Sequence, residues 1–280
     1  MILELKGIYK DYQQGKMIVP VLKDVNFSME EGEYVAIMGP SGSGKSTLMN
    51  VLSGIYPYGS YEGNIIYDGE ICKFNTIKDS EHKGIVIIHQ ELALIPYMTI
   101  GENMYLGNER GKSFSINWNE TYGEADKYLK IVGLEESSRT LIKDIGVGKQ
   151  QLVEIAKALA KNAKLLILDE PTAMLDPNGR KEVLEAVREL NRKEKVTVIL
   201  ITHYMEEVIH ADRVYVMDSG NVVMQGNPKE IFSQVDTLKK YGLDVPQVTL
   251  LAYELKKSGV DVPDGILTTE ELVSALCQSN

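Results

Sequence analysis

The chain has 280 residues, of which 44% are hydrophobic and 25% are charged, a composition typical of a globular protein with one large domain or two smaller ones. The formal net charge of −10 argues against a nucleic-acid-binding surface as the main function. Two cysteines, Cys72 and Cys277, are too few for a disulfide framework, so a reducing compartment is expected.

The N-terminal region has the alternating pattern of half-exposed antiparallel strands. Apolar and polar residues alternate over residues 1–6 and 19–27, and residues 64–67 form a similar segment between glycines. Residues 1–6 lack the charged, apolar and small-residue order of a signal peptide, so export is not expected. These segments predict a small antiparallel β layer.

A continuous apolar run at residues 34–38 leads into a phosphate-binding pattern. Residues 39–47 fit G-x-x-x-x-G-K-[ST] in full, and an apolar-periodic stretch follows at 48–52. In such a strand, loop and helix, backbone N–H groups surround phosphate oxygens, Lys45 reaches the terminal phosphates and Ser46 is placed to hold Mg²⁺. The sequence therefore predicts a nucleotide site made by Gly39, Ser41, Gly42, Ser43, Gly44, Lys45, Ser46 and Thr47.

Four more apolar runs match the first and predict strands buried on both faces of a mainly parallel sheet. They are residues 84–88, 165–168, 196–201 and 214–217. None approaches the roughly 20 residues needed to cross a bilayer, so any membrane role is expected to be peripheral. Helices are expected in the connections.

The region after the second run has a helical pattern. Gln90 stands at its start, where its amide is expected to sense Mg²⁺ or water; an exposed loop glutamine is the alternative. The stretches 120–132 and 150–161 have the strongest helical periodicity. Residues 91–162 are therefore predicted to be a helical subdomain inserted in the sheet.

Two adjacent carboxylates, Asp169 and Glu170, end the buried run 165–168. Because adjacent residues on a strand point to opposite faces, Asp169 is expected to orient Mg²⁺ or its waters. Glu170, at the strand exit, is expected to polarise the water that attacks the γ-phosphate. The alternative is a strand that ends in solvated acids, and the phosphate loop upstream disfavours it.

A histidine follows the next buried run after one threonine. His203 is expected to meet the γ-phosphate and the attacking water, although a lone histidine is usually structural. His82, His89 and His210 are interpreted as structural.

Helix-start signals continue to the end of the chain. Asp176 precedes Pro177, and two capping patterns follow at residues 227–230 and 268–271. The tail is therefore expected to be helical. We predict a domain over residues 1–235 and a helical extension over residues 236–280.

These motifs, in this order, resemble those of ABC-type ATPase subunits over about residues 2–235. The resemblance implies an α/β P-loop NTPase fold with a RecA-like mainly parallel sheet, an antiparallel β subdomain, the helical insert and the tail. It implies ATP and Mg²⁺ as cofactors, with Tyr12 stacked on adenine, although a tyrosine that merely belongs to a strand is the alternative. It implies catalytic roles for Glu170, His203, Lys45 and Gln90, and metal roles for Ser46, Gln90 and Asp169.

The signature motif departs from the family pattern. Where the family usually has Leu-Ser-Gly-Gly-Gln, residues 145–150 read Ile-Gly-Val-Gly-Lys-Gln. In the family two subunits pack head to tail and each signature faces the partner's γ-phosphate. Gly146 and Gly148 retain backbone N–H groups, but the missing hydroxyl removes a hydrogen bond worth roughly 1.5–3 kcal/mol. Weakened closure, or a heteromeric partner with a better signature, is expected.

The finer resemblance changes along the chain. Residues 1–50 are similar to lipoprotein-release and macrolide exporter ATPases, and residues 51–173 to simple-sugar import ATPases, where a Gly-Val-Gly signature is familiar. Residues 174–280 resemble energy-coupling-factor ATPases, in which the tail is a dimerisation element. This mosaic suggests a recombined or designed chimaera with seams near residues 50 and 174, and one divergent subunit is the alternative.

The resemblance as a whole implies an ABC transporter subunit that hydrolyses ATP at the interface of a homodimer or heterodimer. It implies a cytoplasmic protein bound to a transmembrane permease at the inner face of the cell membrane, with no nucleic-acid partner. The alternative is a chimaeric scaffold that binds ATP, hydrolyses it weakly and has no transport partner.

Overall fold

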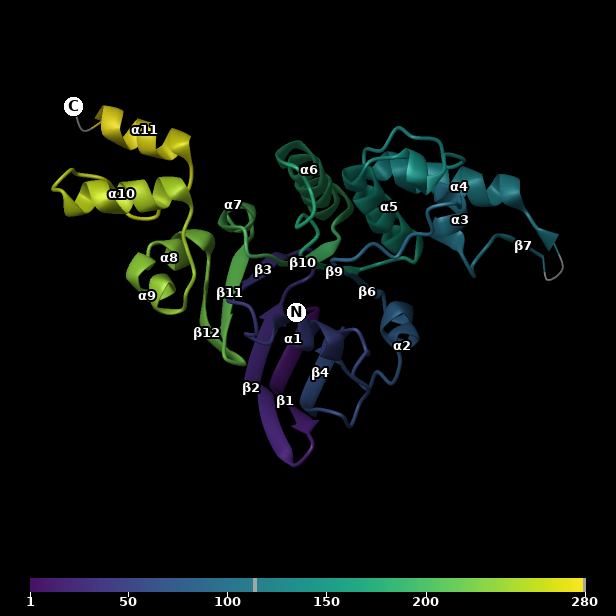
Figure 1. Ribbon diagram of the computed structural model, residues 1–280, viewed down its shortest axis with the longest axis horizontal. Helices are drawn as coiled ribbons and strands as arrows, with labels where there is room; N and C mark the ends of the chain where they lie inside the picture. The colour runs from purple at the N-terminus through teal and green to yellow at the C-terminus, as the bar shows by residue number, and fades with distance from the viewer. Residues whose placement is uncertain (113–114, 279–280) are drawn as a thin grey trace.

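The computed structural model describes residues 1–112 and 115–278. A central sheet has a small antiparallel sheet on one side and a helical layer on the other, and a helical arm carries the C-terminal part of the chain (Figure 1). Two parts of the sequence predictions, residues 113–114 of the insert and 279–280 of the tail, lie outside the described residues.

The central sheet has the strand order β12-β11-β3-β10-β9-β6. The five apolar runs form its parallel strands, as predicted: β3 (Tyr34–Met38), β6 (Ile85–Ile88), β9 (Leu165–Asp169), β10 (Thr197–Ile201) and β11 (Arg213–Asp218). An antiparallel edge strand, β12 (Asn221–Gly226), completes it and was not predicted. The arrangement confirms the α/β P-loop architecture.

The register of the central strands brings the ends of three of them to one edge. Ile201 on β10 pairs with Asp169 on β9 and with Ile37 on β3. In an open parallel sheet, ligands bind outside the carboxyl ends of the strands. The phosphate loop after β3, the acids at the end of β9 and the histidine after β10 therefore share that edge.

The predicted β layer is a four-stranded antiparallel sheet of order β2-β1-β4-β5. Its strands are β1 (Leu3–Gln14), β2 (Met17–Met29), β4 (Glu62–Tyr67) and β5 (Glu70–Cys72). Register shifts between β1 and β2 change which residues of β2 face inward, so Leu22 is buried while Val19 is 36% exposed. The helix α1 (Lys45–Leu52) packs in one core with both sheets.

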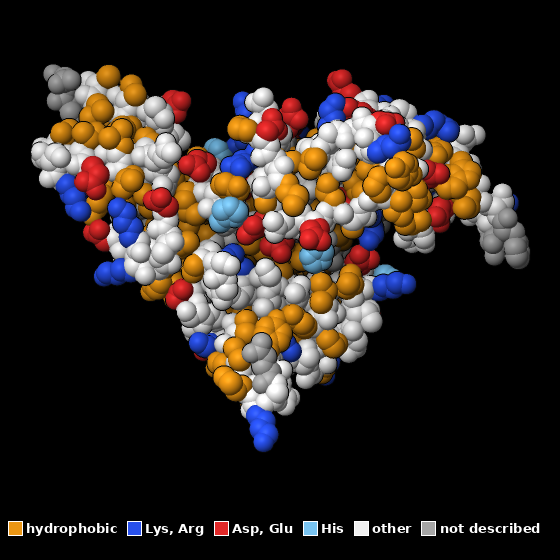
Figure 2. Space-filling model, viewed as in Figure 1, with side chains coloured by type: hydrophobic (Ala, Val, Ile, Leu, Met, Phe, Trp, Pro, Cys, Tyr) orange, Lys and Arg blue, Asp and Glu red, His pale blue; other side chains and the backbone are white. Residues whose placement is uncertain are grey.

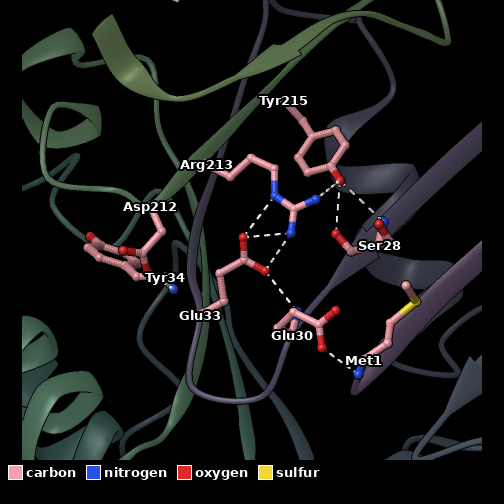
Figure 3. Close-up of polar contacts among 8 residues, drawn as sticks. All are labelled: Met1, Ser28, Glu30, Glu33, Tyr34, Asp212, Arg213 and Tyr215. Atoms are coloured by element: carbon pink, nitrogen blue, oxygen red, sulfur yellow. Dashed lines mark hydrogen bonds and ion pairs between the residues drawn. The ribbon is translucent and has the colours of Figure 1, made fainter.

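A hydrogen-bonded network joins β2 to the central sheet at the end opposite the phosphate loop (Figure 3). The guanidinium of Arg213 donates to both carboxylate oxygens of Glu33 at 2.7 and 2.8 Å. The hydroxyl of Tyr215 donates to the Ser28 carbonyl at 2.8 Å, and the terminal amino group of Met1 pairs with the Glu30 carboxylate. The charged fork thus ties the segment before β3 to β11, and the Tyr215–Ser28 hydrogen bond attaches β2 of the antiparallel sheet to β11.

The insert is helical as predicted, with a short hairpin in addition. Its elements are α3 (Ile100–Tyr105), β7 (Gly111–Lys112), β8 (Ser115–Ile116), α4 (Trp118–Ile131), η1 (Ile142–Asp144) and α5 (Val147–Ala160). The helix α2 (Ile77–His82) precedes β6, and α6 (Pro177–Glu194) follows β9.

The N-terminal turns of α5 and α6 approach each other through bare glycine backbone. A Cβ atom on Gly148 would lie 3.4 Å from the Cα of Gly179. A Cβ atom on Gly179 would lie 2.9 Å from Oδ1 of Asp176, the N-cap of α6, which accepts a hydrogen bond from the Gly179 amide. The predicted Asp176 cap is therefore confirmed, and it stands beside the start of α5.

The tail is helical over its described residues. A short helix, α7 (Met205–Val208), follows β10, and the C-terminal helices are α8 (Pro228–Phe232), α9 (Val235–Lys240), α10 (Gln247–Lys257) and α11 (Thr269–Gln278). Both predicted capping patterns are present, at Asn227 with Glu230 and at Thr268 with Glu271. In residues 1–112 and 115–278, each helix is too short or too polar to cross a membrane.

Candidate nucleotide-binding and catalytic site

A cleft of about 410 Å³ opens at the carboxyl edge of the central sheet. In Figure 2, acidic and histidine side chains gather near the centre of the viewed face, between the helical layer and the antiparallel sheet. The cleft contains all eight predicted phosphate-loop residues together with Glu170 and His203. Its lining residues are Val21, Gly39, Ser41, Gly42, Ser43, Gly44, Lys45, Ser46, Thr47, Glu170 and His203.

The phosphate loop requires glycine at two positions. A Cβ atom on Gly39 would lie 2.2 Å from the Met217 carbonyl oxygen, which leaves no room for a side chain. Gly44 has a φ of 102°, and a Cβ there would lie 2.9 Å from the Val21 carbonyl oxygen. The backbone of β2 therefore closes over the loop, and Val21 lines the cleft although its sequence carries no signal for this role.

Lys45 is the charged centre of the loop. Its ammonium group is buried and donates to the Gly39 carbonyl at 2.7 Å, the Pro40 carbonyl at 3.0 Å and Ser43 Oγ at 3.3 Å. Burial lowers the pKa of Lys45, whereas the carboxylates of Glu170 and Asp169 oppose that shift. A desolvated ammonium that is bonded only to neutral oxygens lacks a compensating negative charge. Binding of an anion in place of these oxygens is therefore favourable.

Asp169 and Glu170 face Lys45 from the end of β9. Burial raises the pKa of Asp169 and the nearby Glu170 charge raises it further, while His89 and Lys45 lower it. A nearby cation reduces the repulsion between two neighbouring carboxylates. Lys45 supplies one positive charge here, which offsets only part of that repulsion. The pair therefore favours binding of a divalent ion.

Glu170 and His203 lie side by side in an unusual backbone setting. Glu170 has a φ of 49°, and its Oε2 is 3.3 Å from Nδ1 of His203. The Glu170 amide donates to the Ile201 carbonyl at 2.9 Å, which fixes the turn after β9 against the end of β10. A non-glycine residue in the left-handed region is costly and is retained where a side chain must take a required direction.

A family model described as ABC transporter matches residues 22–173, which is just over half of the chain. The chain belongs to this family. A second model, described as the energy-coupling factor transporter EcfA1 C-terminal domain, matches residues 248–280 of this chain.

The curated relatives differ in how much of their own length this chain covers. The L-arabinose transport ATP-binding protein AraG of Geobacillus stearothermophilus is 54% identical over 79% of this chain and 42% of its own length. The energy-coupling factor transporter ATP-binding protein EcfA1 of Clostridium novyi (strain NT) is 40% identical over 99% of this chain and 98% of its own length. The chain thus spans less than half of the sugar-transport relative and nearly all of the EcfA1 relative.

Solved structures agree with the fold. The cassette MJ0796, in a dimeric post-hydrolysis state bound to ADP and Pi, has a TM-score of 0.68 and 30% identity over 81% of this chain and 99% of its own. The protein cbiO1 from Clostridium perfringens, part of the transporter complex cbiONQ, has a TM-score of 0.72 and 30% identity, covering 90% of this chain and 98% of its own.

The sequence predicts ATP and Mg²⁺ as cofactors, and the donor atoms near the phosphate loop fit the ion. Mg²⁺ at nucleotide sites takes one or two protein ligands together with phosphate oxygens and water. Ser46 is exposed in the first turn of α1, and Asp169 stands at the carboxyl end of β9, which is separated from β3 by β10. The Ser46 hydroxyl and the Asp169 carboxylate are therefore oxygen ligands suited to a hard cation such as Mg²⁺.

The Asp169→Asn variant should separate metal binding from stability. Removal of the raised-pKa carboxylate relieves its repulsion with Glu170, so the nucleotide-free variant should gain on the order of 1 kcal/mol in free energy of unfolding at neutral pH. As pH falls toward the ordinary value of 3.8, native Asp169 takes up its proton before the unfolded chain does, so the wild type recovers and the difference should vanish. Denaturant titration at several pH values measures both effects.

The same Asp169→Asn variant should bind ATP more weakly with Mg²⁺ than the wild type does. Asp11→Asn, at an exposed position of β1, is the matched control and should change neither property. A variant less stable than the wild type at neutral pH without nucleotide would contradict the repulsion.

Three predicted contact residues lie outside the described lining of the cleft: Asp169 at the end of β9, Tyr12 and Gln90. Tyr12 is half-buried, and its hydroxyl is 3.1 Å from Thr47 Oγ1 and 2.6 Å from the Tyr56 hydroxyl, which places it beside the end of the phosphate loop. Gln90 is exposed just after β6, and the adjacent His89 lies near enough to influence Asp169. Adenine stacking by Tyr12 and metal binding by Gln90 stay predictions.

The signature residues also lie away from this cleft. Gly146 is the N-cap of α5, it is exposed together with Val147, and among the described residues no side chain caps that helix end. Gly148 instead faces Gly179. The structure therefore does not bring Gly146 and Gly148 to the phosphate loop of their own chain.

Proposed function

We propose that this chain hydrolyses ATP with Mg²⁺ in a head-to-tail dimer and thereby drives transport through a membrane permease. The observation that carries this proposal is the separation of two anion-binding elements. The cleft holds Lys45 and Glu170, whereas the uncapped N-terminus of α5 opens to the surface elsewhere on the same described chain. Free N–H groups at a helix N-terminus attract anions, so a second subunit can add them to the first subunit's phosphate site.

Within each site, the proposed roles follow from position. Lys45 and the loop amides hold the phosphates, Tyr12 stacks on adenine, and Glu170 with His203 positions and activates the attacking water. Hydrolysis is then mainly positioning and charge stabilisation. Metal contacts are assigned to Ser46, Gln90 and Asp169, and the partner supplies Gly146 and Gly148.

The proposed assembly is an energy-coupling-factor type of transporter. The full-length match to EcfA1 and the match of residues 248–280 to its C-terminal domain support this, and the solved relative cbiO1 is part of a transporter complex. We assign residues 1–235 to the ATPase domain, 91–162 to the permease-facing insert and 236–280 to the dimerising extension. The chain would then work in the cytoplasm at the inner face of the membrane.

The chimaera hypothesis stays a prediction. Its seam near residue 50 lies inside α1, whose residues Met49 and Val51 share one core with both sheets, and its seam near residue 174 lies in the turn after β9. The EcfA1 relative matches 99% of the chain. The test below distinguishes an active ATPase from a scaffold that binds ATP without turnover.

The test is ATP hydrolysis per subunit over a wide range of protein concentration, with Mg²⁺ present and the oligomer sized with and without ATP. A composite site predicts that specific activity rises with concentration, because each site needs a second subunit. Specific activity that is low and flat, from a monomer that binds nucleotide, would remove the dimer mechanism and leave the scaffold.

A further inference from the structure

A buried carboxylate behind the catalytic residues has no role in the function proposed so far. Glu207, on α7, is 2% exposed. Its Oε1 accepts a hydrogen bond from Thr172 Oγ1 at 2.5 Å, and its Oε2 accepts one from Thr202 Oγ1 at 2.6 Å. Both threonines are buried, so one carboxylate joins two separate segments inside the protein.

Those two segments carry the residues proposed to act on water. Thr172 is two residues after Glu170, in the turn where Glu170 has a φ of 49°. Thr202 immediately precedes His203, and its hydroxyl oxygen also accepts the Tyr204 amide at 3.0 Å. The two hydrogen bonds of Glu207 therefore fix the backbone on either side of the 3.3 Å contact between Glu170 and His203.

An arginine from α6 stands beside this carboxylate and also beside the histidine segment. Arg180 Nε is 3.6 Å from Glu207 Oε1 and is buried without a hydrogen-bond partner among the described residues. The Arg180 guanidinium lies 3.6 Å from the ring centre of Tyr204, whose ring is 4.1 Å from that of His203. A buried carboxylate requires such compensation, because an unpaired buried charge is costly.

We propose that Glu207 is a positioning residue that holds Glu170 and His203 together for ATP hydrolysis, with Arg180 as its counter-charge. This inference rests on the proposed function of Glu170 and His203. The strained turn at Glu170 is held on one side by the Glu170 amide bond to the Ile201 carbonyl and on the other by Thr172, which Glu207 fixes. Reacting groups displaced by about 1 Å lose on the order of 100-fold in rate, so the clamp should act on turnover rather than on binding.

The experiment compares Glu207→Gln with Glu206→Gln, the same change at the exposed neighbouring position. Glutamine keeps the shape but one of its two terminal atoms can no longer accept a threonine hydrogen bond. The expected result is a kcat lowered by about 10- to 100-fold for Glu207→Gln with ATP affinity changed by less than about 3-fold. Glu206→Gln should match the wild type. Equal kcat values for the two variants, or equal losses in affinity and kcat, would overturn the positioning role.

A second pair of variants covers the case in which Glu207→Gln does not fold. Thr202→Ser keeps the hydroxyl that reaches Glu207, and Thr202→Val removes it with little change in volume. Turnover retained by the serine variant and lost by the valine variant, at unchanged ATP affinity, is the expected result. Similar turnover in both would contradict the clamp.

Amide hydrogen exchange tests the role of Glu207 without any measurement of ATP hydrolysis, so this inference and the proposed function can fail separately. Loss of the clamp should speed amide exchange of residues 170, 172 and 173 and of residues 202–205 in nucleotide-free Glu207→Gln, by about 10-fold or more, and leave β1 and α10 unchanged. If the wild type hydrolyses no ATP, the proposed function fails, yet this exchange pattern still tests the clamp. Unchanged exchange in both segments would refute the clamp whatever the ATPase activity.

Discussion

Replacement of Lys45 by alanine is expected to abolish tight binding of ATP. The Lys45 ammonium is buried at the centre of the loop and at present donates to the Gly39 and Pro40 carbonyls. Hydrogen bonds to charged groups contribute roughly 1.5–3 kcal/mol each. Loss of two such bonds to phosphate should weaken binding by at least about 100-fold, and calorimetric titration with ATP and Mg²⁺ measures it.

The stability of the Lys45→Ala protein should not fall in parallel. Burial already lowers the pKa of Lys45, which means that the charged form is held at a cost in the nucleotide-free protein. Lys193→Ala, at a side chain that is 60% exposed on α6, is the control and should bind ATP as the wild type does. ATP affinity within about 3-fold of the wild type in Lys45→Ala would show that the cleft is not the phosphate site.

Replacement of Glu170 by glutamine should block turnover while binding persists. The amide has the shape of the carboxylate, so the contact with His203 and the left-handed backbone conformation can both be kept, but glutamine accepts no proton from water. Loss of a general base costs roughly 100- to 10,000-fold in rate. Phosphate release under single-turnover conditions is the direct measurement.

An ATP-bound dimer should accumulate in the same variant, because hydrolysis no longer separates the subunits. Light scattering with and without ATP detects it. Glu185→Gln, at a side chain that is 54% exposed on α6, should retain turnover and show no such accumulation. Undiminished turnover in Glu170→Gln would remove Glu170 from the catalytic role.

The sequence was most informative where burial is uniform along a segment. The runs that form β3 and β10 are buried at every residue, so their continuous apolar character reveals them almost to the residue. The edge strand β12 is half-buried and has a mixed pattern, so it was missed. In β2 the bulges move Leu22 to the inside, and simple alternation cannot anticipate such a shift.

Motif spacing located the site but not the direction of every side chain. The phosphate-binding pattern predicted the residues that line the cleft, but the steric limits at Gly39 and Gly44 come from the Met217 and Val21 carbonyls, on strands that the motif does not include. Gln90 and Tyr12 belong to recognisable positions, yet their neighbours are set by tertiary packing. Glu207 gave no signal at all, because its partners Thr172 and Thr202 come together only when β9 and β10 pair.

The contact between Gly148 and Gly179 gives the two helix starts a fixed spacing. In their first turns α5 and α6 meet backbone to backbone, with hydrogen atoms in place of side chains at Gly148 and Gly179. A partner that docks against the exposed start of α5 therefore meets the Asp176 turn at a fixed distance from that helix end. A methyl group on Gly179 would press on the Asp176 carboxylate and alter that turn without touching any residue that lines the cleft.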